Sequence, residues 1–221
     1  KTHATIVMPK NAPLIKINNT KKFGAKIVFY DSLKESREKI ATQIAFEEGK
    51  KIIKPYDDLD IIAGQGTLGK EISEELSLLN IKPDIYLCCC GGGGLLAGSA
   101  TYLKQTFPDI KIFSVEPKDF NDTELSLQKK SIIANNSSVK SICDALLATQ
   151  PGDLTFPINM HNLTEGLCVD DNEVENAIIT IAENLKILAE PGGAVAVAAL
   201  LSKKINFEDK NVVVVISGGN I

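Results

Sequence analysis

Residues 84–98 read DIYLCCCGGGGLLAG, and they carry the strongest structural signal in the chain. An apolar run over residues 85–90 is followed by four consecutive glycines and then by a run of Leu, Ala and Gly that suits a helix. Continuously apolar runs of this length are typical of parallel strands that are covered on both faces of a sheet. The stretch therefore predicts a buried strand, a glycine turn and the start of a helix.

The turn consists of Gly91, Gly92, Gly93 and Gly94, and Leu95 opens the expected helix. Glycines can turn successive N–H groups toward one point because no side chain stands in the way. The first turn of the helix adds free N–H donors and the positive end of its dipole. Such a cradle binds anions, of which phosphate is the usual example. The alternative interpretation is a flexible turn without a ligand.

The remaining sequence alternates short β-branched runs with longer amphipathic runs, which predicts an α/β fold with an open, twisted, mainly parallel sheet flanked by helices. Strands are expected over residues 4–8, 26–30, 51–53, 84–90, 111–116, 163–169 and 212–216. Helices are expected over residues 13–22, 33–48, 66–79, 95–106, 155–161, 173–189 and 194–201. The polar stretch 118–153 interrupts this alternation and is expected to be a long loop with a helical turn or two.

A domain boundary is expected near residues 52–61, where Pro55 and several aspartates break the alternation. Residues 1–55 are then the remnant of a smaller α/β lobe. Residues 56–221 form a larger α/β domain that lacks an N-terminal segment.

The composition excludes several classes of protein. Of the 221 residues, 44% are apolar and 24% are charged, which is ordinary for a globular domain and excludes disorder. No apolar run reaches about 18 residues, so no membrane-spanning helix is expected. A net charge of −4 argues against nucleic acid and acidic membrane surfaces as partners. The five cysteines, three of them consecutive at 88–90, fit no disulfide framework, so we expect buried thiols in a reducing, cytoplasmic compartment.

Two more motifs follow expected elements. Ser217 and Gly218 come directly after the valine-rich strand 212–216, so they are expected at the carboxyl edge of the sheet, where open α/β sheets bind ligands. The alternative is a turn in which the serine caps a helix. Glu190 ends the helix expected over 173–189, where the helix dipole disfavours an acid. Either a further role or simple exposure would explain it.

Two nucleotide-binding motifs are present in part. The pattern Gly92-x-Gly94-x-x-Ala97 satisfies the dinucleotide fingerprint, and Glu116 lies 22 residues beyond Gly94, where a ribose-binding acid belongs. This interpretation points to NAD. The pattern over residues 64–71 has the glycines and lysine of a P-loop, but its last position is an acid instead of the hydroxyl that binds Mg²⁺. We therefore reject the P-loop.

Four motifs occur together and in a characteristic order: Gly-Gln-Gly-Thr at 64–67, the glycines at 91–94, Glu-Pro-Gly-Gly-Ala at 190–194 and Ser-Gly-Gly-Asn at 217–220. In this combination the chain resembles the pyridoxal-phosphate enzymes of fold type II. Within that group it is similar to threonine and serine dehydratases, close to serine racemase and hydroxyaspartate dehydratase. The resemblance covers nearly the whole chain and implies pyridoxal 5′-phosphate as the cofactor.

The resemblance also implies roles for particular residues. The glycine loop would hold the cofactor phosphate, Ser217 would hydrogen-bond the pyridine nitrogen, and Glu190 would lie near the ring. Gly218 would let the backbone pass close beside the ring. The cofactor-binding residues implied in this way are Gly91, Gly92, Gly93, Gly94, Leu95, Glu190, Ser217 and Gly218.

A divalent cation is implied by the same resemblance. Its ligands would be Glu116, the carbonyl of Phe120 and Asp122, and oxygen ligands of this kind suit Mg²⁺ or Ca²⁺. The alternative is an acidic loop that caps the next helix. A cation and an NAD ribose would compete for the same Glu116.

The resemblance places the catalytic lysine outside this sequence. Members of the family bind the cofactor as a Schiff base on a lysine in a Ser-x-Lys segment ahead of a Ser-Gly-Asn-His segment, and this pair of segments does not occur here. We therefore expect the lysine upstream of Lys1, and a chain that is inactive alone. Many relatives also carry Asp-Gly where this chain has Asp144-Ala145, which adds a methyl group near the cofactor.

The parent protein is thus expected to be a homo-oligomeric threonine or serine ammonia-lyase. It would eliminate the β-hydroxyl of a small amino-acid substrate and release a 2-oxo acid and ammonia. A serine racemase or a hydroxyaspartate dehydratase shares all of these motifs. An NAD-binding module and a truncated, non-catalytic paralogue that only binds a ligand or a partner are the remaining alternatives.

Overall fold

The computed structural model describes residues 3–32, 34–135 and 140–221. The chain divides into two compact units, one of Lys1–Ile53 with Asn220–Ile221 and the other of Lys54–Gly219. Each unit contains its own parallel sheet, so each is described by itself. Among the helices of the described residues, none is long and apolar enough to cross a membrane.

The smaller unit is a parallel strand pair with two helices. Its elements are β1 (Thr5–Pro9), α1 (Leu14–Lys22), β2 (Lys26–Tyr30) and α2 (Arg37–Glu48). The two strands pair along their whole length, and α1 connects them. In the same unit, the amide of Asn19 donates a hydrogen bond to the side-chain oxygen of Asn220 at 2.9 Å.

Two predictions for this unit need correction. The helix predicted over 33–48 begins only at Arg37, because the side chain of Ser36 caps it by accepting a hydrogen bond from the N–H of Lys39. Residue 33 itself lies outside the described part. The strand predicted over 51–53 is wrong, since these residues form no regular element and belong to neither sheet. So short an apolar run is not stable as a strand without a neighbour to pair with.

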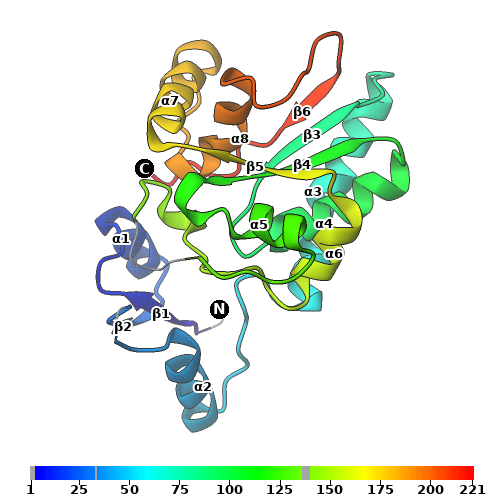
Figure 1. Cartoon of the computed structure of the whole chain (residues 1–221). Coiled ribbons are helices and arrows are strands. Elements are labelled where there is room, and N and C mark those ends of the chain that lie inside the picture. The colour runs from blue at the N-terminus through cyan, green and yellow to red at the C-terminus, as the bar shows by residue number, and fades with distance from the viewer. Residues whose placement is uncertain (1–2, 33, 136–139) are drawn as a thin grey trace. The chain divides into compact units, whose positions relative to one another are not determined.

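The larger unit is built on a four-stranded parallel sheet with the strand order β5-β4-β3-β6 (Figure 1). The strands are β3 (Ile85–Cys89), β4 (Lys111–Pro117), β5 (Glu165–Val169) and β6 (Val212–Val214). Leu87 of the interior strand β3 lies opposite Phe113 of β4 and opposite Val214 of β6. Every residue of β3 is buried, as its apolar sequence predicts. The parallel α/β architecture predicted from the sequence is therefore confirmed.

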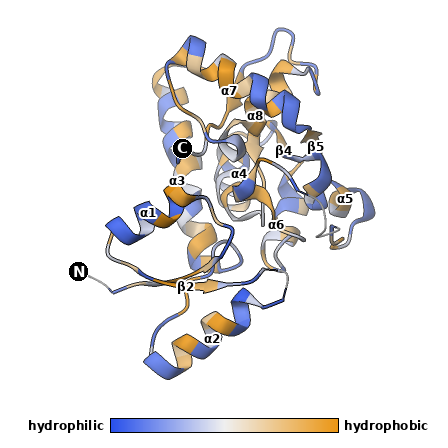
Figure 2. Ribbon diagram, turned by 90° about the vertical axis from the view of Figure 1, so that its left-hand side faces the viewer, coloured by the Kyte–Doolittle hydropathy of each residue, from blue (hydrophilic) through white to orange (hydrophobic). Residues whose placement is uncertain are grey.

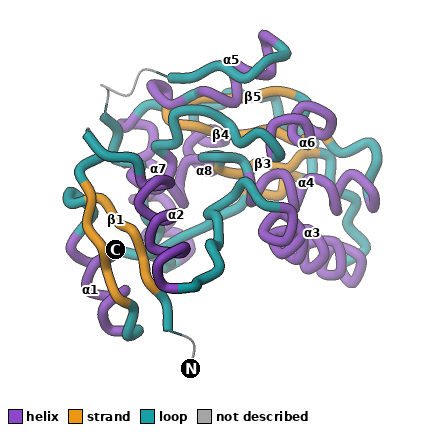
Figure 3. Tube along the Cα trace, turned by 90° about the horizontal axis from the view of Figure 1, so that it is seen from below, coloured by secondary structure: helices purple, strands orange, loops and turns teal. Residues whose placement is uncertain are grey.

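Helices cover both faces of this sheet. They are α3 (Leu59–Leu78), α4 (Gly94–Thr106), α5 (Asp122–Lys129), α6 (Thr155–Asn162), α7 (Asp171–Leu185) and α8 (Pro191–Leu201). α8 packs against β3, β4 and β5, α7 packs on α8, and α3 packs along α4. Figures 1 and 3 show α7 and α8 on the opposite side of the sheet from α4 and α6. Right-handed crossovers require this division, because the chain moves along the sheet in one direction from β3 to β5 and in the other from β5 to β6.

Helix α8 is apolar on every side and lies in the core. Its sequence, PGGAVAVAALL, contains no charged or polar side chain, and seven of its residues are buried. Figure 2 shows the hydrophobic colour along this helix. A helix that is apolar all round belongs in a protein interior, which matches its place between the sheet and α7.

Helix α3 begins well before its predicted start at residue 66. Asp58 caps it, and the carboxylate accepts hydrogen bonds from two N–H groups of the first turn. The aspartates that suggested a break in the α/β pattern therefore include the cap of a helix. The P-loop-like pattern at 64–71 lies inside α3, which agrees with its rejection because a helix cannot wrap a phosphate.

The junction between α7 and α8 corrects the placement of Glu190. α7 ends at Leu185 instead of residue 189, because Lys186 adopts a left-handed conformation with φ 57°. α8 begins at Pro191 instead of residue 194, and Glu190 is its N-cap residue. The acid therefore lies at the positive end of a helix dipole, where it is favoured, and the expectation that it ends the preceding helix is wrong.

The polar stretch 118–153 contains three short elements. They are the 3₁₀ turns η1 (Lys118–Phe120) and η2 (Asp144–Leu146) and the helix α5. Residues 136–139 lie outside the described part. In the residues on either side of that gap, the loop is confirmed, but α5 is an eight-residue helix that the sequence did not predict.

Candidate functional site

The glycine loop lies at the carboxyl end of β3, between Cys89 and the start of α4. Gly93 is the N-cap of α4 with φ 90°, a conformation that L side chains rarely adopt. A Cβ atom on Gly92 would collide with the ring of Tyr56, and one on Gly94 would lie 2.8 Å from the Cβ of Tyr56. The loop is closely packed against its neighbours, which argues against a flexible turn.

Helix α6 holds two carbonyl groups of this loop. The hydroxyl of Thr155 donates a hydrogen bond to the carbonyl oxygen of Gly92 at 2.6 Å, and the amide of Asn159 donates to that of Gly93 at 3.2 Å. Both side chains are buried, with 0% and 1% of their surface exposed. Two carbonyl oxygens of the loop are thus occupied by protein, which favours its N–H groups as the side that meets an anion.

Ser217 lies at the same edge of the sheet as the glycine loop. β6 pairs in parallel with β3, so the carboxyl ends of the two strands meet there. The thiol of Cys89, the last residue of β3, donates a hydrogen bond to Oγ of Ser217 at 3.1 Å, across 128 positions of sequence. The structure therefore brings together two of the motifs that the sequence singled out.

Glu190 and Gly218 lie against each other at the start of α8. The N–H of Glu190 donates a hydrogen bond to the carbonyl oxygen of Gly218 at 2.9 Å. A Cβ atom on Gly218 would collide with the carboxylate of Glu190, and one on Gly193 would lie 2.5 Å from the carbonyl oxygen of Gly218. The glycine at 218 is needed for this close approach between the chain after β6 and α8.

The turn η2 connects the glycine loop with α8. A Cβ atom on Gly91 would lie 3.5 Å from Cα of Leu146, and one on Gly192 would lie 3.3 Å from Cγ of the same leucine. Cys143 directly precedes the turn, and burial raises the pKa of its thiol to about 11. The glycine loop, Ser217 and the start of α8 therefore belong to one cluster at the carboxyl edge of the sheet.

The acid pair Glu116 and Asp122 lies at the end of β4. Glu116 is fully buried, and its two oxygens accept hydrogen bonds from the N–H groups of Thr123 at 2.9 Å and Glu124 at 2.8 Å. Burial and the nearby charge of Asp122 raise the pKa of Glu116. Glu116 thus caps the first turn of α5, as the alternative interpretation expected. Because Glu116 is fully buried, its carboxylate is not accessible to the ribose of an NAD molecule, which argues against the dinucleotide interpretation.

Asp122 is the first residue of α5, and η1 with its last residue Phe120 separates it from Glu116. Asp122 is 1% exposed, and burial raises the pKa of its carboxyl to about 7. One oxygen accepts a hydrogen bond from the amide of Asn135 at 2.7 Å, whereas Oδ2 has no hydrogen-bond partner among the described residues. Two buried acids so close together call for a compensating positive charge or a shared proton.

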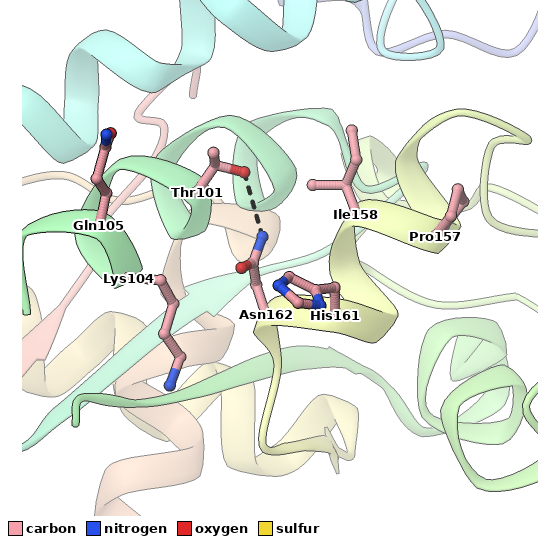
Figure 4. Close-up of a pocket in the computed structure, with 7 residues that line it drawn as sticks. All are labelled: Thr101, Lys104, Gln105, Pro157, Ile158, His161 and Asn162. Atoms are coloured by element: carbon pink, nitrogen blue, oxygen red, sulfur yellow. Dashed lines mark hydrogen bonds between the residues drawn. The ribbon is translucent and has the colours of Figure 1, made fainter. Parts of the chain in front are cut away.

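A surface groove lies elsewhere, between α4 and α6. It has a volume of about 610 Å³ and is lined by Thr101, Lys104, Gln105, Pro157, Ile158, His161 and Asn162 (Figure 4). The amide of Asn162 donates a hydrogen bond to Oγ1 of Thr101 at 3.2 Å across it. None of the residues predicted from the sequence to bind cofactor or metal lines this groove.

Four residues that touch the site carry no signal in the sequence. Tyr56 packs on the glycine loop, Thr155 and Asn159 bond its carbonyl groups, and Cys89 bonds Ser217. Each contact joins positions far apart along the chain, which no local pattern reports. A polar residue on the buried face of a short helix, as Thr155 is, offers at most a hint.

Comparison with known proteins bears on the family of this chain. The profile of the family described as "Pyridoxal-phosphate dependent enzyme" matches residues 1–218. L-threo-3-hydroxyaspartate ammonia-lyase of Saccharomyces cerevisiae is 40% identical over 218 residues, which cover 99% of this chain and 65% of that protein. Serine racemase of Schizosaccharomyces pombe is 38% identical, with 99% of this chain and 66% of that protein covered.

A solved structure extends this likeness to the fold. A threonine deaminase from T.th. superimposes with a TM-score of 0.89 at 30% identity, and the match covers 100% of this chain and 69% of that one. The chain therefore spans about two thirds of the length of the proteins that it resembles.

Proposed function

Because the chain belongs to the pyridoxal-phosphate dependent enzymes, we propose that its glycine loop and Ser217 together bind pyridoxal 5′-phosphate. The observation that carries the proposal is the hydrogen bond between Cys89 and Ser217, which joins the strand that leads into the loop to the serine. Parallel α/β sheets bind their ligands at this carboxyl edge.

The residues at this edge fit the phosphate group. The loop lacks side chains that would cover its N–H groups, and the N-terminus of α4 adds a positive potential. The proposed phosphate ligands are the N–H groups of Gly91, Gly92, Gly93, Gly94 and Leu95. The left-handed φ of 90° at Gly93 and the lack of space for a Cβ atom support a loop shaped for this purpose.

Ser217 and Glu190 would act on the ring. When bound, pyridoxal phosphate supplies an electron sink that takes up the electrons left when a proton leaves Cα of the substrate. The hydroxyl of Ser217 would donate a hydrogen bond to the ring nitrogen and, being neutral, would leave the sink milder than a carboxylate would. A mild sink suits loss of the β-hydroxyl, because negative charge need not persist on the ring. Glu190 would lie beside the ring, with Gly218 packed against its carboxylate.

The substrate that we propose is a small β-hydroxy amino acid. The names of the three similar proteins refer to 3-hydroxyaspartate, serine and threonine, and all three compounds carry a hydroxyl on Cβ. Elimination of that hydroxyl as water leaves an enamine, which water then hydrolyses to a 2-oxo acid and ammonia. We propose L-threonine or L-serine as the preferred substrate, with racemisation of serine and elimination from hydroxyaspartate as the alternatives.

We propose that the whole protein supplies the lysine that carries the cofactor, a role that none of the residues named above fills. We propose, from the family resemblance, that the lysine that carries the cofactor lies upstream of Lys1; this chain spans 65% of the yeast ammonia-lyase. We also propose that the whole protein is a homo-oligomer, which analytical ultracentrifugation would establish.

The experiment compares this chain with the same chain extended at its N-terminus by the natural upstream sequence. Both are incubated with pyridoxal phosphate, reduced with borohydride and measured by mass spectrometry. The proposal expects site-specific covalent attachment in the extended chain alone, at a lysine upstream of Lys1. Attachment at surface lysines to the same extent in both chains would contradict it.

A product assay on the extended chain tests the reaction. We expect 2-oxo acid and ammonia from L-threonine or L-serine, and strong loss of activity in Ser217→Ala. Formation of D-serine without 2-oxo acid would establish the racemase instead, and a preference for L-threo-3-hydroxyaspartate would establish the third activity.

The acid pair is proposed to hold Mg²⁺ or Ca²⁺ through Glu116, the carbonyl of Phe120 and Asp122. What supports a cation is that the nearby charge of Asp122 raises the pKa of the buried Glu116, and that Oδ2 of Asp122 bonds no described residue. Hard oxygen ligands of this kind match both cations.

A further inference from the structure

We propose that Thr155 and Asn159 of α6 are positioning residues that aim the N–H groups of Gly93 and Gly94 at the phosphate of the ligand. The inference rests on the proposed function, in which the glycine loop binds a phosphate. It assigns a role to a helix that carries none of the motifs of the family resemblance.

The hydroxyl of Thr155 accepts one hydrogen bond and lies within donating distance of two carbonyl oxygens. It accepts a hydrogen bond from the N–H of Gly152 at 3.0 Å, and it donates one to the carbonyl oxygen of Gly92 at 2.6 Å. The second acceptor, the carbonyl oxygen of Gly152, is 3.3 Å away, so the hydroxyl hydrogen goes to the much nearer carbonyl of Gly92. The N–H of Gly152 also lies 3.3 Å from the same carbonyl oxygen, so Gly92 is held from two directions.

The amide of Asn159 performs the same task one residue further along. Its nitrogen lies 3.2 Å from the carbonyl oxygen of Gly93. The same oxygen also accepts the first helical hydrogen bond of α4, from the N–H of Ala97 at 2.8 Å. Asn159 is therefore placed where the loop becomes the helix.

The geometry of the peptide bond determines where the N–H groups of Gly93 and Gly94 point once these contacts are made. In a trans peptide the C=O group and the N–H group of the next residue point in opposite directions. Thr155 draws the carbonyl of Gly92 toward α6, so the N–H of Gly93 points away from α6. Asn159 does the same for the peptide between Gly93 and Gly94. Both N–H groups consequently face the side of the loop on which the phosphate is proposed to bind.

A loop of glycines needs such constraints. Glycine has more accessible conformations than any other residue, so an unrestrained loop would spend much of its time with these peptides turned over. Burial makes the two hydrogen bonds effective, because a peptide that turned over would leave a buried carbonyl or a buried side chain without its partner. α6 itself is anchored at its start, where the N–H of Leu154 donates to the carboxylate of Asp57 at 2.8 Å.

The experiment measures how much the phosphate contributes to binding. Kd values are determined for pyridoxine 5′-phosphate and for pyridoxine, which lack the aldehyde and so cannot react with lysines. The Kd of pyridoxine divided by the Kd of pyridoxine 5′-phosphate measures how much the phosphate strengthens binding. We expect Thr155→Val to lower this ratio about tenfold and Thr155→Ser, which keeps the hydroxyl, to leave it within about twofold of the parent. Asn159→Leu should lower it by about threefold to tenfold.

Thr101→Val is the matched control. Thr101 also bonds α6, through Asn162 at 3.2 Å (Figure 4), but this contact does not involve the glycine loop. The variant should leave the Kd ratio unchanged. If Thr155→Val fails to fold, Asn159→Leu carries the test, and the ¹⁵N–¹H chemical shifts of Gly93 and Gly94 on addition of pyridoxine 5′-phosphate give a second readout. These shifts should shrink in Asn159→Leu and persist in Thr101→Val.

The outcomes separate this inference from the proposed function. A ratio near one in the chain without substitutions would show that the phosphate has no site here, and the proposed function would fail. A large ratio in the parent that Thr155→Val and Asn159→Leu both preserve would show that the loop orients its own donors, and the inference alone would fall. Equal weakening of both probes would also overturn it, because that result indicates only damage to the fold.

Discussion

The thiol of Cys89 donates a hydrogen bond to the hydroxyl of Ser217, with 3.1 Å between the two heavy atoms. The contact joins the last residue of β3 to the chain that follows β6, so it fixes the serine relative to the glycine loop. Because the hydroxyl oxygen accepts from the thiol, the hydroxyl hydrogen is available for a ring nitrogen. The thiol, 5% exposed, thus contacts a residue of the proposed cofactor site, although the sequence marks it only as a core residue.

Replacing this thiol should affect the site and not only the core. Cys89→Ala removes the donor, and we expect it to weaken binding of pyridoxine 5′-phosphate about threefold and to lower the free energy of unfolding by about 1–2 kcal/mol. Cys89→Ser keeps a donor and should retain the affinity. Cys88→Ala is the control, because successive residues of a strand face opposite ways and the thiol of Cys88 donates to a backbone carbonyl. Equal losses of affinity in Cys88→Ala and Cys89→Ala would refute this role.

Local patterns predicted the elements that local forces determine. The apolar run of β3, the glycines after it and the start of α4 follow one another in sequence and in space, so the strand, turn and helix could be read directly. Alternation of strands and helices predicted the parallel sheet, because only crossover connections join parallel strands. The candidate site residues at 91–94 and 217 follow strands that pair, which explains why they lie at the same edge of the sheet.

The features that the sequence did not predict depend on helix capping and on contacts between residues that are distant in sequence. The starts of α3 and α8 were misplaced because Asp58 and Glu190 act as N-cap residues, a choice that depends on where the preceding chain ends. The packing of Tyr56 on the loop joins residues more than thirty positions apart, and no periodicity reports such a contact. The residues that hold the loop in shape were therefore visible only in the structure.

Gly93→Ala should be strongly destabilising. The residue has φ 90°, and an added Cβ would lie 2.7 Å from the amide nitrogen of Asn159 and 3.0 Å from Oγ1 of Thr155. Strain and overlap together predict a loss of about 2–4 kcal/mol in the free energy of unfolding, measured by urea titration. Gly64→Ala is the opposite case, since it lies in α3 with no atom within 4 Å of the added Cβ, and it should gain up to about 1 kcal/mol. Similar effects of the two substitutions would contradict the close packing of the loop.

Lowering the pH should weaken the ion pair between Glu173 of α7 and Lys204, which follows α8. Lys204 Nζ lies 2.8 Å from Oε1 of Glu173, whose other oxygen accepts the N–H of Asp170 in a capping box. Burial raises the pKa of Glu173, but the bonds from Lys204 and Asp170 outweigh it and hold the pKa below the usual 4.5. A depressed pKa in the folded state means that this stabilisation is present above pH 4.5 and is lost as the pH falls below it.

Lys204→Met tests this pH dependence. At pH 7 we expect a loss of about 0.5–1 kcal/mol in the free energy of unfolding, because the pair is partly exposed. The loss should be smaller at pH 3 than at pH 7, because Glu173 is progressively protonated as the pH falls below 4.5. Lys82→Met is the control, since Lys82 pairs with Asp109 while 68% of its side-chain surface is exposed, and it should change stability by less than about 0.3 kcal/mol. A loss from Lys204→Met that is the same at both pH values would mean that packing, not charge, is responsible.

Cation binding at the acid pair predicts a thermal shift that depends on Asp122. Asp122 is buried beside Glu116, and a divalent ion would relieve the repulsion between the two carboxylates. With MgCl₂ or CaCl₂ at about a hundredfold above Kd, the melting temperature should rise by about 5–10 °C in the parent chain, which differential scanning calorimetry would measure. Asp122→Asn should abolish most of the rise, whereas Asp119→Asn, an exposed acid of the same loop, should preserve it. A parent chain that shows no shift with either salt would leave Glu116 as a helix cap alone.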